Sequence, residues 1–182
     1  MVVLIVGGSG SGKSAVAENM VMELDSSDSK VYIATMLCSD DDAKRRVEKH
    51  RLLRAGKGFV TVEKPVEVKN VPDCLAGMEK TALLECVSNL VANEMFNKDL
   101  RKDTVNKPLY EGIFEEIAVL SDSFDNLFIV TNNVFDDGRD YDSYTEEYME
   151  NLGRLNELLA EFADEVYEVV AGIPIQIKRV KS

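Results

Sequence analysis

The sequence predicts an α/β fold with a doubly wound, mostly parallel sheet flanked by helices. Apolar runs typical of buried strands alternate with amphipathic helical stretches along the whole chain. Near its start, a strand at 2–6, a helix at 13–24 and a strand at 31–35 form a βαβ unit. Such a unit implies parallel strands joined by a right-handed crossover. The 182 residues suit one domain, spanning 1–182, with one substantial core.

The rest of the chain continues this alternation. Further strands are predicted at 59–62, 81–85, 127–131, 165–171 and 173–178, and further helices at 39–54 and 87–96. A last, long helix is predicted from apolar residues recurring at spacings of three and four: Tyr144, Tyr148, Leu152, Leu155, Leu159 and Phe162.

Composition excludes several classes of protein. The formal net charge of −12 disfavours non-specific binding to nucleic acid or to an anionic membrane. No apolar run approaches the ~18 residues of a membrane span, and the first residues lack the pattern of a signal peptide. Cys38, Cys74 and Cys86 have no metal-ligand spacing. We therefore expect a cytoplasmic protein without disulfides or a zinc site.

A glycine-rich loop follows the first predicted strand. Residues 7–14 read GGSGSGKS and fit the pattern G-x-x-x-x-G-K-[ST]. Glycines let backbone N–H groups wrap around a phosphate, and the following helix adds free amides and its positive dipole end. We expect Lys13 to reach the β- and γ-phosphates and Ser14 to ligate Mg²⁺. A flexible glycine–serine turn is the alternative, but the flanking strand and helix favour the phosphate-binding loop.

The only histidine of the chain lies in a basic segment, KRRVEKHRLLR. Arg46, His50 and Arg54 are spaced to lie on one face of a helix. Guanidinium groups suit phosphate oxygens, and nearby positive charge favours neutral imidazole, the nucleophilic form. The set fits attack on a phosphorus atom. Two alternatives stay open: the same residues could bind phosphates without a covalent step, or form a solvated basic face.

Two acidic residues follow predicted buried strands, the place where P-loop enzymes hold Mg²⁺ directly or through water. Glu85 ends the strand predicted at 81–85, after three apolar residues, and is the better placed, although Asp is more familiar there. Glu63 follows the strand at 59–62 and is the second candidate. The acidic run at 136–140 lacks the alternating ligands and distal Glu of a calcium loop, which favours a solvated turn.

Specific segments extend in order through nearly the full length. They are GGSGSGKS at 7–14, YIAT at 32–35, RVEKHR at 46–51, LLECVSNLVAN at 83–93, VTNNV at 130–134 and GRLNELLAEFADEVYEVVAGIPIQIK at 153–178. Together they resemble the bifunctional adenosylcobinamide kinase/adenosylcobinamide-phosphate guanylyltransferases of cobalamin biosynthesis. The loop is shared by many families, but the R-V-x-x-H-R element and the 153–178 segment are far more specific.

The resemblance implies a RecA-like P-loop fold, a trimer and a two-step enzyme. First, ATP or GTP phosphorylates the hydroxyl of the adenosylcobinamide aminopropanol arm. Second, a histidine attacks the α-phosphate of GTP and releases pyrophosphate. The phosphorylated corrinoid then takes GMP from the guanylyl-histidine, giving adenosylcobinamide-GDP. A covalent phosphoramidate divides one hard displacement into two easier ones, while Mg²⁺, Lys13 and arginines offset charge on the leaving pyrophosphate.

The resemblance also assigns residues. The nucleophile falls on His50, which together with Lys13 makes the catalytic set, and Ser14 and Glu85 are the expected Mg²⁺ ligands. The nucleotide-binding positions, with Arg46 added on its spacing, are Gly7, Gly8, Ser9, Gly10, Ser11, Gly12, Lys13, Ser14, Ala34, Thr35, Arg46, Arg51, Leu52, Leu53, Arg54, Glu63 and Glu85.

Two segments depart from the family pattern. Gly10 replaces an arginine of the family loop, which removes a positive charge near the phosphates, and the 133–138 segment differs from the usual E-V-G and proline stretch. Two alternative functions therefore stay open: a P-loop kinase for another small alcohol, and a nucleotide-binding regulatory protein. The second is disfavoured because the chain has no D-x-x-G switch segment and no N-K-x-D guanine motif.

Overall fold

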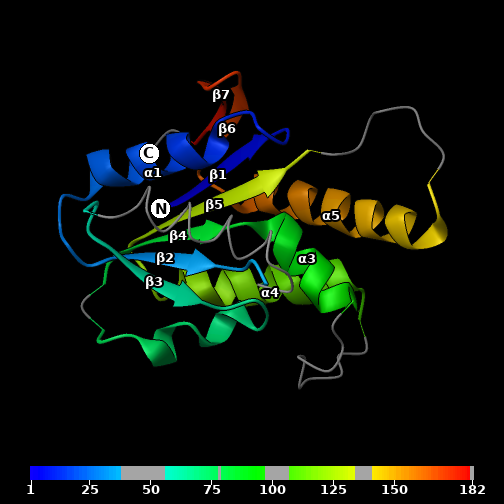
Figure 1. Cartoon of the computed structure of the whole chain (residues 1–182), viewed down its shortest axis with the longest axis horizontal. Helices are drawn as coiled ribbons and strands as arrows, with labels where there is room; N and C mark the ends of the chain where they lie inside the picture. Colours follow the sequence, from blue (N-terminus) through cyan, green and yellow to red (C-terminus); the bar gives the residue numbers. More distant parts are fainter. Residues whose placement is uncertain (38–55, 78, 97–106, 134–140, 181–182) are drawn as a thin grey trace.

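Seven strands of the described residues form one sheet in a computed structural model of the chain, which describes residues 1–37, 56–77, 79–96, 107–133 and 141–180 (Figure 1). The strands are β1 (Val2–Gly7), β2 (Lys30–Ala34), β3 (Phe59–Glu63), β4 (Thr81–Glu85), β5 (Asn126–Asn132), β6 (Glu165–Val170) and β7 (Ile173–Arg179). The α-helices are α1 (Lys13–Leu24), α3 (Val87–Phe96), α4 (Leu109–Ser121) and α5 (Ser143–Phe162).

The sheet is mostly parallel, as predicted. Its order is β3-β2-β4-β5-β1-β6-β7, and β7 alone among these strands runs antiparallel, paired with β6. The strand β1 lies between β5 and β6 and pairs with both, so it connects the β6–β7 hairpin to the rest of the sheet. Parallel strands place their carboxyl ends at one edge, so Gly7, Ala34 and Glu85, the last residues of β1, β2 and β4, lie along that edge.

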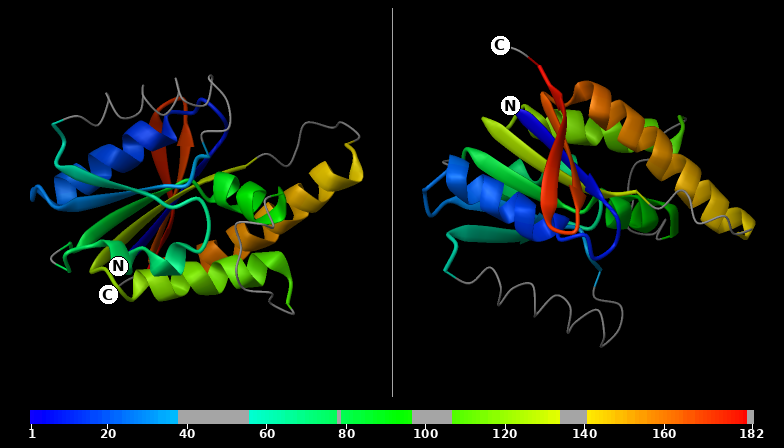
Figure 2. Two further views of the ribbon diagram at one scale, coloured as in Figure 1. Left: turned by 60° about the horizontal axis from the view of Figure 1, so that its bottom comes forward. Right: turned by 90° about the horizontal axis from the view of Figure 1, so that it is seen from above.

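Helices cover both faces of the sheet, which buries the central strands β1, β2, β4 and β5 on two sides. Alternate residues of β1 show the division: Leu4 joins the core beneath α3, α4 and α5, whereas Val3 and Ile5 join the core beneath α1. The helix α1 lies on one side of the sheet and α4 and α5 lie on the other (Figure 2). No helix in the described ranges is both long and apolar enough to cross a membrane.

Most predicted elements are confirmed within one or two residues at each end. The helices at 13–24 and 87–96 and the strand at 81–85 agree with the structure, and the last helix extends over Ser143–Phe162. Its central Leu152, Leu155 and Leu159 are fully buried, whereas Tyr144 and Phe162 are exposed. The helix predicted at 39–54 lies outside the described residues.

The sequence does not predict α4, nor the short 3-10 helices at Val68–Asn70 and Pro72–Cys74. In α4 the buried Ile113, Ile117 and Leu120 follow a helical spacing. The polar stretch before the helix and the glycine in its second turn, Gly112, weaken that signal. Packing against the sheet and α5 offsets the cost of Gly112 and stabilises the helix.

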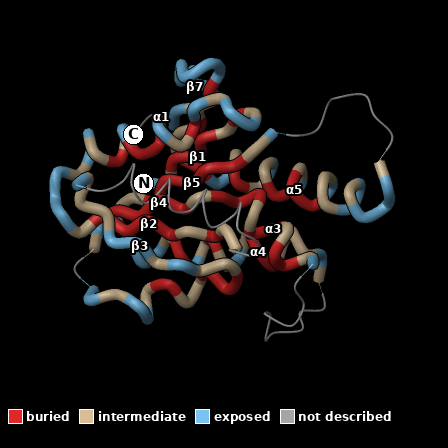
Figure 3. The backbone as a smooth tube through the Cα atoms, in the orientation of Figure 1, coloured by how far each residue is buried: buried red, intermediate tan, exposed pale blue. Residues whose placement is uncertain are grey.

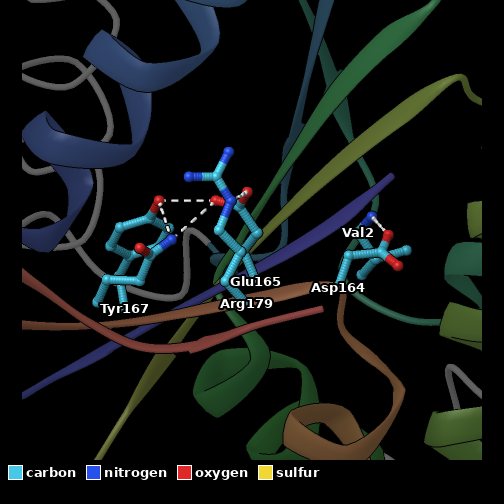
Figure 4. A network of polar contacts seen from close by, with 6 residues as sticks. Val2, Asp164, Glu165, Tyr167 and Arg179 are labelled. Carbon is cyan, nitrogen blue, oxygen red and sulfur yellow. Dashed lines mark hydrogen bonds and ion pairs between the residues drawn. The ribbon is translucent and has the colours of Figure 1, made fainter. Parts of the chain in front are cut away.

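The β6–β7 hairpin forms one end of the sheet and is polar on one face. The Tyr167 hydroxyl donates to Glu165 Oε2 at 2.6 Å, the Gln176 amide donates to Tyr167 Oη at 2.8 Å, and Arg179 Nε lies 3.3 Å from Glu165 Oε1 (Figure 4). Partial burial and the adjacent Glu165 carboxylate raise the pKa of Tyr167. These cross-strand contacts fix the register of the hairpin.

The other face of the hairpin carries exposed aliphatic side chains toward the turn. Register places Val170 opposite Ile173 and Glu168 opposite Ile175, so these side chains share a face. Ile173 is 65% and Ile175 50% exposed, and most of β7 is coloured as exposed in Figure 3. A run of large aliphatic side chains in water is uncommon on an edge strand.

Candidate functional site

The glycine-rich loop connects β1 to α1 at the carboxyl edge of the sheet. Gly10 and Gly12 have φ angles of +74° and +88°, which glycine adopts without strain. The Ser11 N–H donates to the Gly8 carbonyl at 3.1 Å and closes a turn of the loop. This arrangement directs the loop into the first turn of α1, whose N–H groups have no partner within the helix.

The loop rests on the turn of the β6–β7 hairpin. The Gly172 N–H donates to the Ser11 carbonyl at 2.7 Å. A Cβ atom on Gly12 would lie 3.2 Å from the Gly172 Cα, and one on Gly7 would lie 2.6 Å from Ser11 Oγ and 2.8 Å from the Val169 carbonyl oxygen. Glycine at positions 7 and 12 thus permits close backbone approach as well as the loop conformation. At Gly10 a Cβ would meet nothing within 4 Å.

Lys13 is the first residue of α1 and is largely buried. Its Nζ donates to the carbonyl of Gly8 at 3.1 Å, which places the ammonium group across the loop. An ammonium here, beside the amides of a helix N-terminus, fits the binding of a polyphosphate.

Ser14 and Glu85 come together across the site. The Ser14 hydroxyl donates to Glu85 Oε1 at 2.6 Å, bringing the second residue of α1 to the end of β4. Mg²⁺ prefers oxygen ligands at about 2.0–2.1 Å in octahedral geometry, so two adjacent ligand oxygens lie about 3 Å apart. The hydroxyl and carboxylate therefore fit a Mg²⁺ ion after a small adjustment. No cluster of three His, Cys, Asp or Glu suited to a metal occurs within the described ranges, and Mg²⁺ at nucleotide sites uses few protein ligands.

Glu63 lies in the same row of strand ends but apart from this pair. Ala34 is in register with Glu63 on one side and Glu85 on the other. Two strand spacings separate the backbones of Glu63 and Glu85 by about 10 Å. Glu63 is exposed, and the two carboxylates are thus suited to different parts of a ligand.

Below Glu85 lies a set of buried hydrogen bonds. Thr35 is fully buried, and its hydroxyl accepts from the Cys86 N–H at 2.8 Å and donates to the Cys86 and Glu85 carbonyls at 2.8 and 3.1 Å. Burial raises the pKa of Cys86, and the neighbouring Glu85 carboxylate adds to that shift. The Cys86 Sγ lies 3.0 Å from Ser88 Oγ. A neutral thiol is thus favoured beside the Glu85 carboxylate.

A second set of polar contacts lies under the end of β5. Thr131 is also fully buried, and its hydroxyl donates to Asn156 Oδ1 at 2.7 Å. The Asn156 amide donates to the Asn132 carbonyl at 3.0 Å, and the Asn132 amide donates to Ser88 Oγ at 2.8 Å. The helix α5 is thereby fixed to the carboxyl edge.

The structure thus brings together the loop, Lys13, Ser14, Ala34, Thr35 and Glu85, with Glu63 farther along the same edge. The remaining predicted site residues lie outside the described residues: Arg46, His50, Arg51, Leu52, Leu53 and Arg54, together with 134–138 of the altered segment.

Sequence reasoning missed Asn93, Asn156 and the role of the Thr35 hydroxyl. A signal for Asn93 existed: it is a polar residue in an otherwise apolar helix segment, LVAN. Its amide donates to the Thr35 and Pro65 carbonyls at 2.7 and 2.9 Å. Local sequence does not indicate such partners, because they lie in segments that follow β2 and β3, far away in the chain.

The chain is similar to known proteins over nearly its whole length. Residues 3–177 match the family model for cobinamide kinase / cobinamide phosphate guanyltransferase. The chain is 30% identical to the bifunctional adenosylcobalamin biosynthesis protein CobU of Escherichia coli and 28% identical to that of Salmonella typhimurium. In both comparisons 98% of this chain and all of the relative are covered.

Solved structures share the fold at low identity. The flagellar accessory protein FlaH of Methanocaldococcus jannaschii gives a TM-score of 0.55 at 14% identity, covering 98% of this chain and 78% of that one. A KaiC-like protein of Pyrococcus horikoshii gives 0.54 at 14% identity, covering 92% and 69%. With the sheet order, these matches confirm the predicted RecA-like P-loop fold.

Proposed function

Because the chain belongs to the cobinamide kinase / cobinamide phosphate guanyltransferase family, we propose that it carries out both reactions of that name. It phosphorylates adenosylcobinamide with ATP or GTP. It then transfers GMP from GTP to adenosylcobinamide phosphate through a guanylyl group on His50, giving adenosylcobinamide-GDP. The supporting observation is the geometry of the glycine-rich loop. Lys13 Nζ donates to the Gly8 carbonyl within this loop, and the Ser14 hydroxyl donates to Glu85.

These residues have distinct roles in the proposal. The loop amides and Lys13 bind and orient the nucleotide phosphates. Ser14 and Glu85 would hold Mg²⁺, which when bound would offset the charge that develops on the phosphates. His50 attacks the α-phosphorus of GTP while Arg46, Arg51 and Arg54 bind phosphate oxygens. The P–N bond forms as the bond to pyrophosphate breaks. The corrinoid phosphate then displaces the imidazole and regenerates free His50.

A labelling experiment tests the covalent step. Purified protein is incubated with Mg²⁺ and α-³²P GTP, denatured, and tested for acid-labile, base-stable label. Wild type should carry label, and His50→Ala should carry none while its melting temperature still rises with Mg²⁺ and GTP. Lys13→Ala is the control that should lose both label and thermal shift. Unlabelled wild type that binds GTP would exclude the transferase proposal.

The altered segment that begins at Asn133 favours testing one alternative, a kinase for a different small alcohol. Adenosylcobinamide and short amino alcohols are offered separately with ATP, and ADP release is measured. Release with adenosylcobinamide supports the proposal, whereas release only with another alcohol supports the alternative.

We further propose that the protein is a single-domain cytoplasmic homotrimer. The described Cys74 and Cys86 are free thiols, which fits a reducing compartment. The exposed Val170, Ile173 and Ile175 are a surface that a second copy of the chain would cover. Light scattering during size-exclusion chromatography measures the mass, and a monomer at micromolar concentration would contradict the trimer.

A further inference from the structure

We infer that Thr35 and Asn93 are positioning residues that hold the Glu85 carboxylate where it can bind Mg²⁺ together with Ser14. The inference rests on the proposed nucleotide site and adds to it two side chains that act through Glu85.

Thr35 links the ends of two strands. It directly follows β2, and its N–H donates to the Glu85 carbonyl at 3.0 Å. Its hydroxyl contacts the Cys86 N–H and both the Cys86 and Glu85 carbonyls, at distances from 2.8 to 3.1 Å. Four backbone contacts on one residue fix the path of the chain as it leaves β4. That path determines where the Glu85 side chain points.

The Thr35 side chain is unsuited to direct contact with a nucleotide. The residue has 0% exposure, and its hydroxyl is surrounded by the backbone of β4 and the following residue. A hydroxyl proton already committed to these carbonyls is not available to a phosphate. The position that the resemblance assigns to nucleotide binding therefore acts here through Glu85.

Asn93 holds Thr35 from the other side. Asn93 lies in α3, the helix that follows β4, and is 7% exposed. One amide nitrogen donates to the carbonyls of Thr35 and Pro65, at 2.7 and 2.9 Å. It thus joins the segments that follow β2 and β3 to the helix that follows β4. A buried amide at this position is explained by these two bonds, since burying it without partners would be unfavourable.

The consequence for the metal follows from geometry. Mg²⁺ requires ligands in nearly ideal octahedral geometry. A displacement of Glu85 away from Ser14 would therefore weaken Mg²⁺ binding more than it weakens binding of the nucleotide without metal. The phosphates would still be bound by the loop and by Lys13, which Thr35 and Asn93 do not contact. The two residues therefore control metal affinity separately from nucleotide affinity.

The test compares two buried threonines at the carboxyl ends of β2 and β5, the strands on either side of β4. Thr35→Val removes the hydroxyl that faces Glu85 and Cys86, and Thr131→Val removes the matched hydroxyl that donates to Asn156. Thr35→Ser keeps the hydroxyl. Mn²⁺, a spectroscopic substitute for Mg²⁺, is titrated into the protein–GTP complex and followed by electron paramagnetic resonance. GTP binding is measured separately in EDTA.

Thr35→Val should raise the Mn²⁺ dissociation constant by about 10- to 100-fold, the usual effect of removing an outer-shell partner. GTP binding in EDTA should change by less than about threefold in every variant, because the loop and Lys13 are untouched. Thr35→Ser and Thr131→Val should resemble wild type in Mn²⁺ affinity. Should Thr35→Val fail to fold, Asn93→Ala takes its place and should shift Mn²⁺ affinity in the same direction.

Equal Mn²⁺ affinity in Thr35→Val and Thr131→Val would overturn the inference, and so would wild type whose GTP complex binds no Mn²⁺. Neither readout depends on covalent chemistry at His50. A wild type that binds Mn²⁺ and GTP without becoming labelled would refute the proposed transfer and leave the inference on Thr35 and Asn93 to be decided by its own variants.

Discussion

Two regions of the molecule differ in which side chains they bury. They are the carboxyl edge of the sheet, at the ends of β2 and β4, and the β6–β7 hairpin. At the edge, Thr35 and Asn93 are polar and buried, and their hydrogen bonds are made within the chain. On the hairpin, Ile173 and Ile175 are apolar and exposed. Buried polar groups and exposed apolar patches are the informative departures from the usual distribution. The polar side chains of the first region have hydrogen-bond partners within the chain. The apolar side chains of the second region stabilise the protein only when another surface covers them.

The two regions meet at the glycine-rich loop. The Gly172 N–H of the hairpin turn donates to the Ser11 carbonyl, and the Ser14 hydroxyl at the other end of the loop donates to Glu85. The loop therefore depends on both. Variants that affect only one region separate the contributions of the two to nucleotide chemistry.

The largest expected effect tests the polar edge. Glu85→Gln keeps the size of the side chain but removes the charge that faces Ser14. Removing one preorganised group that stabilises transition-state charge typically lowers kcat by about 10²–10³. We expect a loss of that order for Mg²⁺-dependent ATP turnover, because Glu85 is proposed to hold the Mg²⁺ that supplies this stabilisation. Glu63→Gln, about 10 Å away along the strand ends, should alter nucleotide affinity and leave the Mg²⁺ dependence unchanged. Equal Mg²⁺ dependence in the two variants would contradict the assignment of Glu85.

A smaller effect is expected where the loop meets the hairpin. In Gly7→Ala the new Cβ would lie 2.8 Å from the Val169 carbonyl oxygen and even closer to Ser11 Oγ. Relieving that overlap must move the loop or β6, and we expect the free energy of unfolding to fall by about 1–3 kcal/mol. Thermal or urea unfolding without nucleotide measures it.

Gly8→Ala is the matched control for that change. It lies one residue further in the same loop, and its Cβ would meet only Asn133 Oδ1 at 3.7 Å, an ordinary contact. Its stability should therefore be within about 0.5 kcal/mol of wild type. Equal losses in the two variants would show that the loop does not rest on the hairpin as closely as the distances indicate.

The exposed face of the hairpin provides the next test. If copies of the chain associate through it, Ile175→Lys would place a charge in the interface and weaken association by about 3 kcal/mol, roughly a hundredfold. Val119→Lys is the control, since Val119 is similarly exposed on α4. Sedimentation velocity at several concentrations should show dissociation in the first variant only. Unchanged association in Ile175→Lys would move the interface elsewhere.

How far the sequence predicts this molecule differs between the same two regions. The strands and the loop were predictable, because each has a local signature: an apolar run for β1 and β4, and glycines with Lys13 for the loop. The apolar residues of β7 were also visible, but their alternation predicts a strand and not which face is covered. Exposure depends on the neighbouring strands, which the local pattern does not specify.

The candidate site was predictable at the residues with a motif or strand-end signature and not at the buried residues behind them. Ser14 and Glu85 come from motif and strand-end position, and the structure brings them to 2.6 Å. Thr35 was predicted for a different role, and Asn93 was not predicted, because their partners lie 28 to 58 residues away in the chain. Hydrogen bonds between distant segments leave no periodic pattern in the sequence.

The smallest expected effect concerns Cys86, which lies beneath the polar edge. Burial, and then the charge of Glu85, raises its pKa above the ordinary value of 9.0. Since the thiolate is the reactive form, the rate of alkylation by iodoacetamide should still be rising between pH 8 and pH 9.5, without a plateau. The raised pKa of Cys86 also makes stability depend on pH. It favours the folded protein below pH 9.0, and this contribution declines as pH rises toward the pKa of Cys86 in the folded state.

Peptide mass mapping follows Cys86 separately from Cys74, which is exposed and should be labelled first at every pH. Ser88→Ala is the informative variant, because the Ser88 hydroxyl lies 3.0 Å from the sulfur and lowers the pKa of Cys86. Without it the rising part of the profile should move to still higher pH. A plateau below pH 9 in wild type would mean that the thiolate is stabilised at this position. The polar edge would then be more open to water than its buried hydrogen bonds imply.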